Sequence, residues 1–328
     1  MAFWAAPLSR DGPGLLLRDL GRDDPSLRAP LALILAADAD VLVLSGLDWD
    51  ADGAALSALA EALAARGAPY PHRLALRPNA GAATGLDMDG DGRRGTARDA
   101  QGYGRFLGDG GLAVLSRLPL GEPRDLSGLA WRDLPGARLP VTPEGAPFPS
   151  EEAQAAQRLS STGHWVVPVL SDPPFDLLAF AATPPLFDGP EDRNGLRNAD
   201  EIALAARLVD GAFGGLSSRF VVAGLANLDP LDGEGRREEI AALLLDPRLQ
   251  DPRPASQGGA ADASGAGEGA LDTAAFAGGA RLRLSYVLPS AGWEVLGAGV
   301  LWPAPGAPLA AEAEQAGPHR LVWADLGP

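Results

Sequence analysis

The sequence contains no cysteine and no lysine. The absence of cysteine excludes disulfide bonds, thiolate nucleophiles and cysteine-ligated zinc sites. All 27 basic residues are arginine, against 43 acidic residues, and the formal net charge is −16. Nucleic acids and anionic membranes are bound mainly by Lys and Arg side chains that neutralise phosphates. This charge balance therefore predicts that neither is a partner.

Long apolar runs are also missing. No stretch approaches the ~20 apolar residues of a membrane-spanning helix, so we expect no transmembrane segment. The first expected strand begins at Phe3-Trp4, which leaves no room for a signal peptide. We expect either a cytoplasmic protein or a mature periplasmic or secreted chain whose leader has been removed.

Common catalytic motifs are absent as well. Three histidines, none of them in an HExxH arrangement, argue against a zinc hydrolase. Ser116 and Ser160 lie outside any GxSxG pattern. The glycine-rich run at residues 108–113 precedes a strand, whereas a phosphate-binding loop follows one.

The sequence does contain short apolar runs that alternate with helical patterns. These runs predict strands at residues 41–45, 74–76, 112–116, 165–170, 177–181, 220–224, 282–288, 295–301 and 321–324. Apolar periodicity predicts helices at residues 54–66, 200–213 and 238–245. Because strands occur over the whole length, we expect one α/β domain, residues 1–328. The low-complexity stretch 254–280 is expected to be a flexible surface loop within it.

Several segments together form a recognisable pattern, including "ADVLVLSGLDWD" (39–50), "ATPPLFDGPEDRNGLRN" (182–198), "GLANLDPLDGEGRR" (224–237) and "PHRLVWADL" (318–326). In this combination the sequence resembles the endonuclease/exonuclease/phosphatase superfamily, and more narrowly a bacterial subgroup whose members are often exported. The resemblance covers nearly the whole chain in the family's order. It implies a deoxyribonuclease I-like fold, a four-layer α/β sandwich in which two packed mixed β-sheets are flanked by helices. It also implies a cleft at one edge of the sheets.

Active members of this superfamily hydrolyse phosphoesters with a divalent metal, usually Mg²⁺. Such chemistry needs metal ligands, a group that orients water, and groups that stabilise charge on the phosphoryl oxygens. The resemblance places these functional positions on Ala5, Gly46, Ala181, Leu225, Asn227, Ser285, Pro318 and His319. Only Asn227 and His319 keep the family's residue type.

The resemblance therefore predicts a degenerate active site. We expect a pseudoenzyme that acts as a binding or structural subunit with a protein partner. The alternative is a metal-dependent phosphoesterase whose rearranged site holds Mg²⁺ through Asp48, Asp50, Asn227 and His319. His164 begins a strand that would end near the same cleft and is a possible site residue, although a structural role is favoured for this histidine.

One metal-binding pattern is intact. In "DMDGDGRRGTARD" (87–99), Asp87, Asp89 and Asp91 alternate before Gly92, as in a calcium loop, where every second side chain faces the ion. The carbonyl of Arg93 and the carboxylate of Asp99 are further expected ligands. We expect structural Ca²⁺ here, remote from the family's catalytic position.

Overall fold

The computed structural model describes residues 1–261 and 265–327. Its first sheet contains β1 (Ala2–Leu8), β2 (Val41–Leu47), β3 (His72–Leu74), β4 (Gly111–Ser116), β12 (Glu294–Leu301) and β13 (Leu321–Gly327), in the order β12-β13-β1-β2-β4-β3. The second contains β5 (Arg124–Asp125), β6 (Gly163–Val169), β7 (Phe175–Ala181), β8 (Phe220–Leu225) and β11 (Ser285–Pro289), in the order β11-β8-β7-β6-β5. A short antiparallel pair, β9 (Ala274–Ala275) and β10 (Arg281–Leu282), stands apart.

Both sheets are mixed, and each has one parallel pair near its centre. In the first sheet β1 runs parallel to β2, and in the second β7 runs parallel to β8. The other pairs are antiparallel. As a result, the C-terminal ends of four central strands lie at one edge of the two packed sheets.

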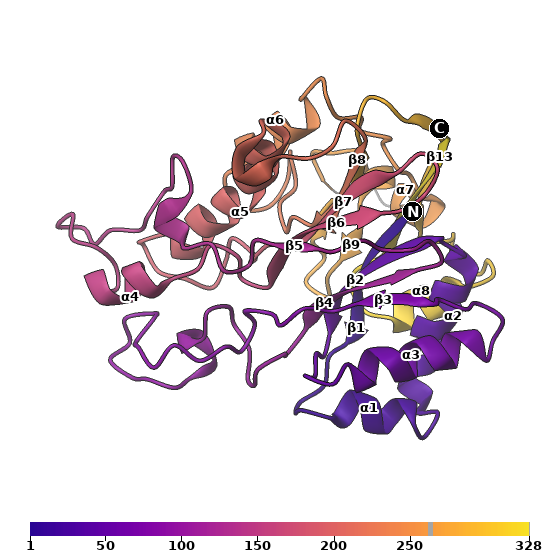
Figure 1. Cartoon of the computed structure of the whole chain (residues 1–328), viewed down its shortest axis with the longest axis horizontal. Helices are drawn as coiled ribbons and strands as arrows, with labels where there is room; N and C mark the ends of the chain where they lie inside the picture. The colour runs from indigo at the N-terminus through magenta and orange to yellow at the C-terminus, as the bar shows by residue number, and fades with distance from the viewer. Residues whose placement is uncertain (262–264, 328) are drawn as a thin grey trace.

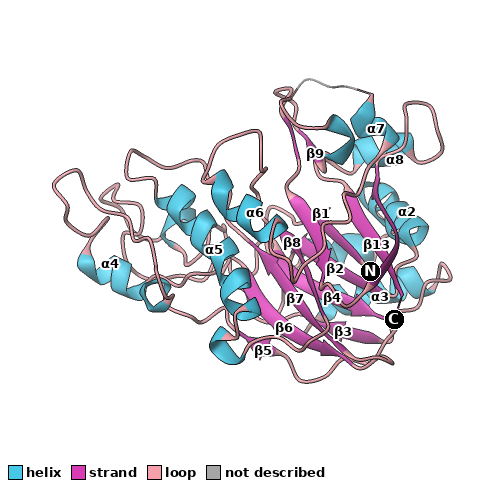
Figure 2. Cartoon of the chain, turned by 90° about the horizontal axis from the view of Figure 1, so that it is seen from above, coloured by secondary structure: helices cyan, strands magenta, loops and turns pink. Residues whose placement is uncertain are grey.

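Helices cover the outer faces of both sheets (Figures 1 and 2). On the first sheet lie α1 (Leu15–Leu20), α2 (Arg28–Ala37), α3 (Ala54–Ala64) and α8 (Ala310–Gln315), and on the second lie α5 (Arg193–Val209) and α6 (Arg237–Leu244). Two short helices, α4 (Glu151–Ala156) and α7 (Gln257–Ala260), belong to long connections. The predicted four-layer α/β sandwich is confirmed. No helix among the described residues is long and apolar enough to cross a membrane.

The strand pattern explains why the sheets bury both faces. In β2, Leu42 and Leu44 pack toward the helices, whereas Val41 and Val43 face the other sheet. This alternation follows from the two-residue period of a strand. Consequently β2 has apolar residues at every one of these positions, as expected for a strand covered on both sides.

Most predicted strands are confirmed within two residues of their ends. The run 282–288 is different, because it divides into β10 and β11. At the break, the Thr273 hydroxyl accepts hydrogen bonds from the backbone N–H groups of Leu284 and Ser285, and the Asp229 carboxylate accepts one from Arg283. These side chains take the place of ladder partners.

The helix predictions were less complete. The helix predicted at 200–213 begins seven residues earlier, as α5, and ends at Val209. Helices α1 and α2 were not predicted. The stretch 254–280 contains α7 and β9, and its Thr273 and Ala274 are buried. Residues 262–264 of this stretch lie outside the described residues.

Candidate functional site

A cavity of about 990 Å³ lies at the edge where the central strands end. Its floor, which we define as Ala5, Gly46, Ala181 and Leu225, is formed by the ends of β1, β2, β7 and β8. Register brings these positions together, because Ala5 pairs with Ser45 next to Gly46, and Ala181 pairs with Leu225. The volume is at the upper end of the range for small-molecule sites, ~300–1,000 Å³.

The floor consists of the positions that the resemblance assigned to catalysis. Asn227, Pro318 and His319 also line the cavity. Ser285 pairs with Leu225 in the sheet but is fully buried and is not among the lining residues. The structure therefore gathers the family's functional positions in one place, and the floor itself carries only hydrocarbon side chains and a glycine.

The backbone at Gly46 differs from an ordinary strand. Gly46 has a φ of +76°. Next to it, the register of β2 shifts relative to both neighbouring strands, β1 and β4. A Cβ atom at this position would lie 2.5 Å from the carbonyl oxygen of Ala6. A residue with a side chain cannot occupy position 46 without a backbone shift, so this position cannot supply a carboxylate in this conformation.

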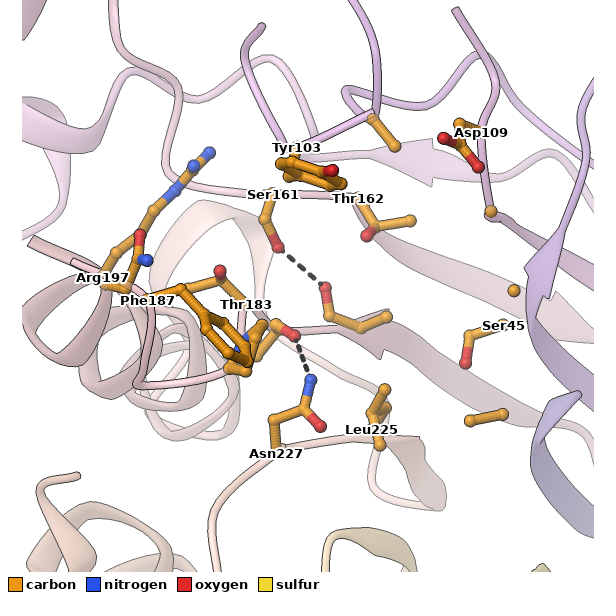
Figure 3. A pocket seen from close by; sticks show the side chains of 18 of the residues that line it. Ser45, Tyr103, Asp109, Ser161, Thr162, Thr183, Phe187, Arg197, Leu225 and Asn227 are labelled. Atoms are coloured by element: carbon orange, nitrogen blue, oxygen red, sulfur yellow. Dashed lines mark hydrogen bonds between the residues drawn. The ribbon is translucent and has the colours of Figure 1, made fainter. Parts of the chain in front are cut away.

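The two retained polar residues both face the cavity. The Asn227 side chain donates a hydrogen bond through Nδ2 to the carbonyl of Ala182, at 2.8 Å (Figure 3). His319 contacts Phe276 edge to face, with ring centroids 5.7 Å apart. Its Nδ1 atom is buried and has no hydrogen-bond partner among the described residues. Burial, with a smaller contribution from the charge of Arg320, lowers the pKa of His319 to about 4, so its imidazole is neutral at pH 7.

The other residues of the proposed rearranged site lie outside the cavity lining. The Asp48 carboxylate accepts hydrogen bonds from the backbone N–H groups of Arg10 and Gly110, at 2.8 and 3.3 Å. Asp50 accepts two from the first turn of α3 and so caps this helix. Burial raises the pKa of Asp48. Both carboxylates have backbone partners, and of the four residues in that arrangement the cavity contains Asn227 and His319.

His164 is part of the core. It is fully buried, its Nδ1 lies 2.5 Å from the Ser160 hydroxyl, and its Nε2 lies 3.1 Å from the backbone carbonyl of Glu201. Its ring stacks on Phe180. Burial lowers the pKa of His164 to about 4, which keeps the ring neutral. These contacts give it the structural role.

The acidic loop brings three of its carboxylates together. Oxygen atoms of Asp87, Asp89 and Asp99 lie within 4.8 Å of one another. Asp91 is not part of this group, and its carboxylate accepts a hydrogen bond from the backbone N–H of Arg93. Burial raises the pKa of Asp89. Burial acts in the same direction on Asp99, but hydrogen bonds from Met88 and Thr96 bring the Asp99 pKa below its usual value.

The expectation that this loop is remote from the positions that the resemblance assigned to catalysis is wrong. Asp89 lines the cavity, together with Arg98, whose guanidinium lies 3.9 Å from the Asp89 carboxylate. The loop forms part of the cavity wall because the segment from residue 80 to 110 folds across the strand ends. The spacing of the aspartates in the sequence does not predict that this loop lies at the strand ends.

Another part of the cavity wall is held by buried charged residues on α5. The Arg197 guanidinium donates hydrogen bonds to four backbone carbonyls, those of Gln101, Arg158, Leu159 and Ser160. One turn later, Glu201 accepts hydrogen bonds from Ser161 and from the backbone N–H of Thr183. Burial lowers the pKa of Arg197 to about 10 and raises that of Glu201, while each partner's charge opposes the effect.

Two aromatic side chains at the cavity were missed by sequence reasoning. Tyr103 is 67% exposed and Phe187 is 72% exposed, and both line the cavity (Figure 3). Phe187 has a φ of +69°, a left-handed conformation that is rare for a bulky residue. Ser45 was missed as well. Its side chain is buried, lines the cavity and has no hydrogen-bond partner among the described residues.

The fold and the cavity define a class, the α/β sandwiches with two packed mixed sheets and a cleft at the strand ends. Within it, the chain belongs to the Endonuclease/Exonuclease/phosphatase family, which it matches over residues 14–307. A search among curated proteins finds no match for the sequence.

Solved structures show the same fold at low identity. An endonuclease/exonuclease/phosphatase from Beutenbergia cavernae is 17% identical with a TM-score of 0.55, over 99% of this chain and 70% of that one. Sphingomyelinase C from Streptomyces griseocarneus is 15% identical with a TM-score of 0.51, over 98% and 97%. A 3′ phosphatase from Neisseria, bound to a product DNA hairpin, is 17% identical with a TM-score of 0.51, over 99% and 98%.

Proposed function

We propose that this chain is a catalytically inactive member of the family that uses the old cleft for binding. The observation that carries the proposal is the conformation of Gly46, where a side chain would collide with the Ala6 carbonyl. The neighbouring floor positions Ala5, Ala181 and Leu225 offer no oxygen or nitrogen from their side chains. Mg²⁺ requires near-octahedral oxygen coordination, and these floor residues do not fit it.

The state of His319 supports the same proposal. Its imidazole is desolvated, with a pKa lowered to about 4, and its buried Nδ1 has no hydrogen-bond partner among the described residues. No carboxylate therefore orients the ring through this atom, as one does in a catalytic Asp–His pair. Asp109 is an acidic residue that lines the cavity. Its carboxylate accepts hydrogen bonds from the Arg105 side chain and from the Ser9 hydroxyl. Burial acts to raise the pKa of Asp109, but the hydrogen bonds from Arg105 bring it below its usual value.

The charge of the chain favours a protein partner with a basic or mixed-charge surface. A net charge of −16 repels phosphate backbones and attracts basic surfaces. We propose such a partner and expect no binding to nucleic acid. Binding of the protein to a fluorescently labelled hairpin DNA at physiological salt, measured by fluorescence anisotropy, would contradict this part of the proposal.

Hydrolysis assays test the loss of activity. Purified protein is incubated with bis(4-nitrophenyl) phosphate and with 4-nitrophenyl phosphate in the presence of Mg²⁺ or Mn²⁺. We expect no release of nitrophenolate above the protein-free control, because loss of one preorganised charge-stabilising group typically costs ~10²–10³ in rate. Metal-dependent turnover that disappears in His319→Ala would show that the alternative, a rearranged phosphoesterase, is correct.

A further inference from the structure

The cavity contains polar atoms that the protein leaves without partners. Ser45 is 3% exposed, and its Oγ has no hydrogen-bond partner among the described residues; the same is true of the buried Nδ1 of His319. A buried polar group without a partner costs about 1–3 kcal/mol. Both atoms belong to residues that line the cavity beside the floor, so a bound molecule can supply the missing hydrogen bonds.

Several neutral polar side chains accompany these two atoms in the cavity. Ser45 and His319 share the cavity with Thr162, Thr183 and Asn227, which are neutral side chains that donate and accept hydrogen bonds. The floor between them is hydrocarbon. A charged ligand group buried here would lose its water without gaining a charged partner, whereas hydroxyl groups would be satisfied.

Most charged residues that line the cavity already have partners within the protein. Asp109 pairs with Arg105 at 2.9 Å, and Asp188 accepts a hydrogen bond from the backbone N–H of Asn194 at 2.5 Å. Arg193 has a buried Nη1 without a hydrogen-bond partner among the described residues, and this is the competing anchor for an anionic group. However, the charges of Asp89, Glu191 and Asp188 already act on this guanidinium.

The two exposed aromatic rings add a flat apolar surface. Phe187 is held in the left-handed region, which costs an L-residue roughly 1–2 kcal/mol, and yet its ring is 72% exposed. A strained residue that presents an unburied ring to a cavity indicates a role in binding. Tyr103 presents a second exposed ring to the same cavity. Aromatic rings bind the apolar faces of other rings by stacking.

We propose that the cavity binds an uncharged ring compound that carries hydroxyl groups, as in a glycoside, with its hydroxyls on Ser45, Asn227 and His319 and a ring face on Tyr103 or Phe187. The inference rests on the proposed function, because it takes the cavity to be a binding site and not a catalytic one. It names the class of ligand, an uncharged ring compound with hydroxyl groups, and predicts that phosphate esters do not bind at the floor.

A matched pair of probes tests the ligand class. Calorimetry compares 4-nitrophenyl glucoside, galactoside and mannoside with 4-nitrophenyl phosphate, so that the aryl group is constant and the second group is either neutral or anionic. We expect at least one glycoside to bind at least tenfold more tightly than the phosphate. Equal or tighter binding of the phosphate, or no binding of any glycoside at millimolar concentration, overturns the inference.

Two buried serines provide a matched control. Ser45 lines the cavity and Ser285 does not, although the hydroxyls of both are buried and without partners. We expect Ser45→Ala to weaken glycoside binding by about 2–10-fold, the range for one hydrogen bond, and Ser285→Ala to leave it unchanged. Equal effects of both substitutions would contradict the assigned contact.

Hydrolysis and glycoside binding, measured on the same protein, distinguish a failure of this inference from a failure of the proposed function. Release of nitrophenolate from the phosphate in the presence of Mg²⁺ or Mn²⁺ refutes the loss of activity. Absence of both hydrolysis and glycoside binding leaves the loss of activity standing and refutes the ligand class.

Discussion

The cavity has two unlike halves. Its floor is made of strand ends that carry methyl groups, a leucine and a glycine, whereas its wall is made of a loop and a helix that carry carboxylates and guanidinium groups. Strand pairing is a backbone interaction, so Ala5, Ala181 and Leu225 are held in place by the strand ladders and not by contacts of their side chains. The wall depends on its side chains, because Arg197 and Glu201 satisfy the backbone of the segments that pack on α5. A floor of this kind can lose its chemistry and still fold.

The largest effect is therefore expected from the wall. Arg197→Ala removes hydrogen bonds to four carbonyls and leaves the fully buried Glu201 carboxylate without its neighbouring charge. A buried polar group left without its hydrogen bond costs about 1–3 kcal/mol, so we expect Arg197→Ala to lose at least about 3 kcal/mol of stability. Chemical denaturation should show this loss in the free energy of unfolding.

Arg98→Ala is the matched control for that variant. Arg98 also lines the cavity, but its guanidinium is exposed and lies 3.9 Å from Asp89. An exposed ion pair of this kind contributes about 0–1 kcal/mol. If both arginine variants lose the same stability, the wall does not depend on the buried network.

The second prediction concerns the acidic loop. Bound Ca²⁺ reverses the repulsion among Asp87, Asp89 and Asp99, and a ligand that binds only the folded state stabilises it by about 2.7 kcal/mol at 100 times its Kd. We expect Ca²⁺ to raise the Tm more than equimolar Mg²⁺, and Asp89→Ala to remove the difference. Asp91→Ala should keep most of the shift, because its carboxylate lies outside the cluster.

Two results would show that the loop is only an acidic turn. One is the absence of calcium binding by calorimetry at millimolar concentration. The other is a Ca²⁺-dependent shift in Tm that survives Asp89→Ala. Because Asp89 also lines the cavity, the same titrations should be made with and without the glycoside probes.

The floor was more predictable from the sequence than the wall. The runs at residues 41–44 and 220–223 are apolar at every position, and the family resemblance then located the strand ends. The positions at Ala5, Ala181 and Leu225 followed from that resemblance, and the structure brings them together. Strand ends can be located because the two-residue period and the family order define them.

The wall depends on contacts between distant segments, which the sequence pattern does not encode. Arg197 has acidic neighbours in the sequence, such as Asp200, but it donates to carbonyls up to 96 positions away. Phe187 combines an exposed ring with a left-handed backbone, and the register of β2 with both β1 and β4 shifts next to Gly46. Neither has a local signature strong enough to predict.

The third prediction concerns how the free energy of unfolding depends on pH through His319, which lines the cavity beside the floor. His319 has a folded-state pKa of about 4, below its unfolded value of ~6.5, so the unfolded chain binds more protons between these values. Its contribution to stability is therefore complete above pH ~6.5 and is lost as the pH falls toward 4. His319→Gln should reduce the loss of unfolding free energy between pH 7 and pH 4.5 by about 1–2 kcal/mol.

Urea denaturation at a series of pH values measures this difference. His72→Gln is the control, because His72 is a partly exposed residue at the sheet edge, away from the cavity lining. An unchanged pH dependence in His319→Gln would mean that the imidazole is not buried in its neutral form. The floor would then be open to an anionic group.

The smallest effect on stability is expected at Phe187. Substitutions here distinguish the backbone strain of this residue from the role of its ring in binding. Glycine adopts a φ of +69° without steric cost, whereas the ring of Phe187 is mostly exposed and buries little apolar surface. Phe187→Gly should therefore change the free energy of unfolding by less than about 1 kcal/mol, since the relief of strain opposes the greater flexibility of glycine in the unfolded chain. Glycoside binding should nevertheless weaken by several fold, because one stacking surface is lost. Phe187→Tyr keeps the ring and should bind as the parent does. A loss of more than 2 kcal/mol of stability in Phe187→Gly, or unchanged binding, would show that the ring packs against the protein and does not serve the cavity.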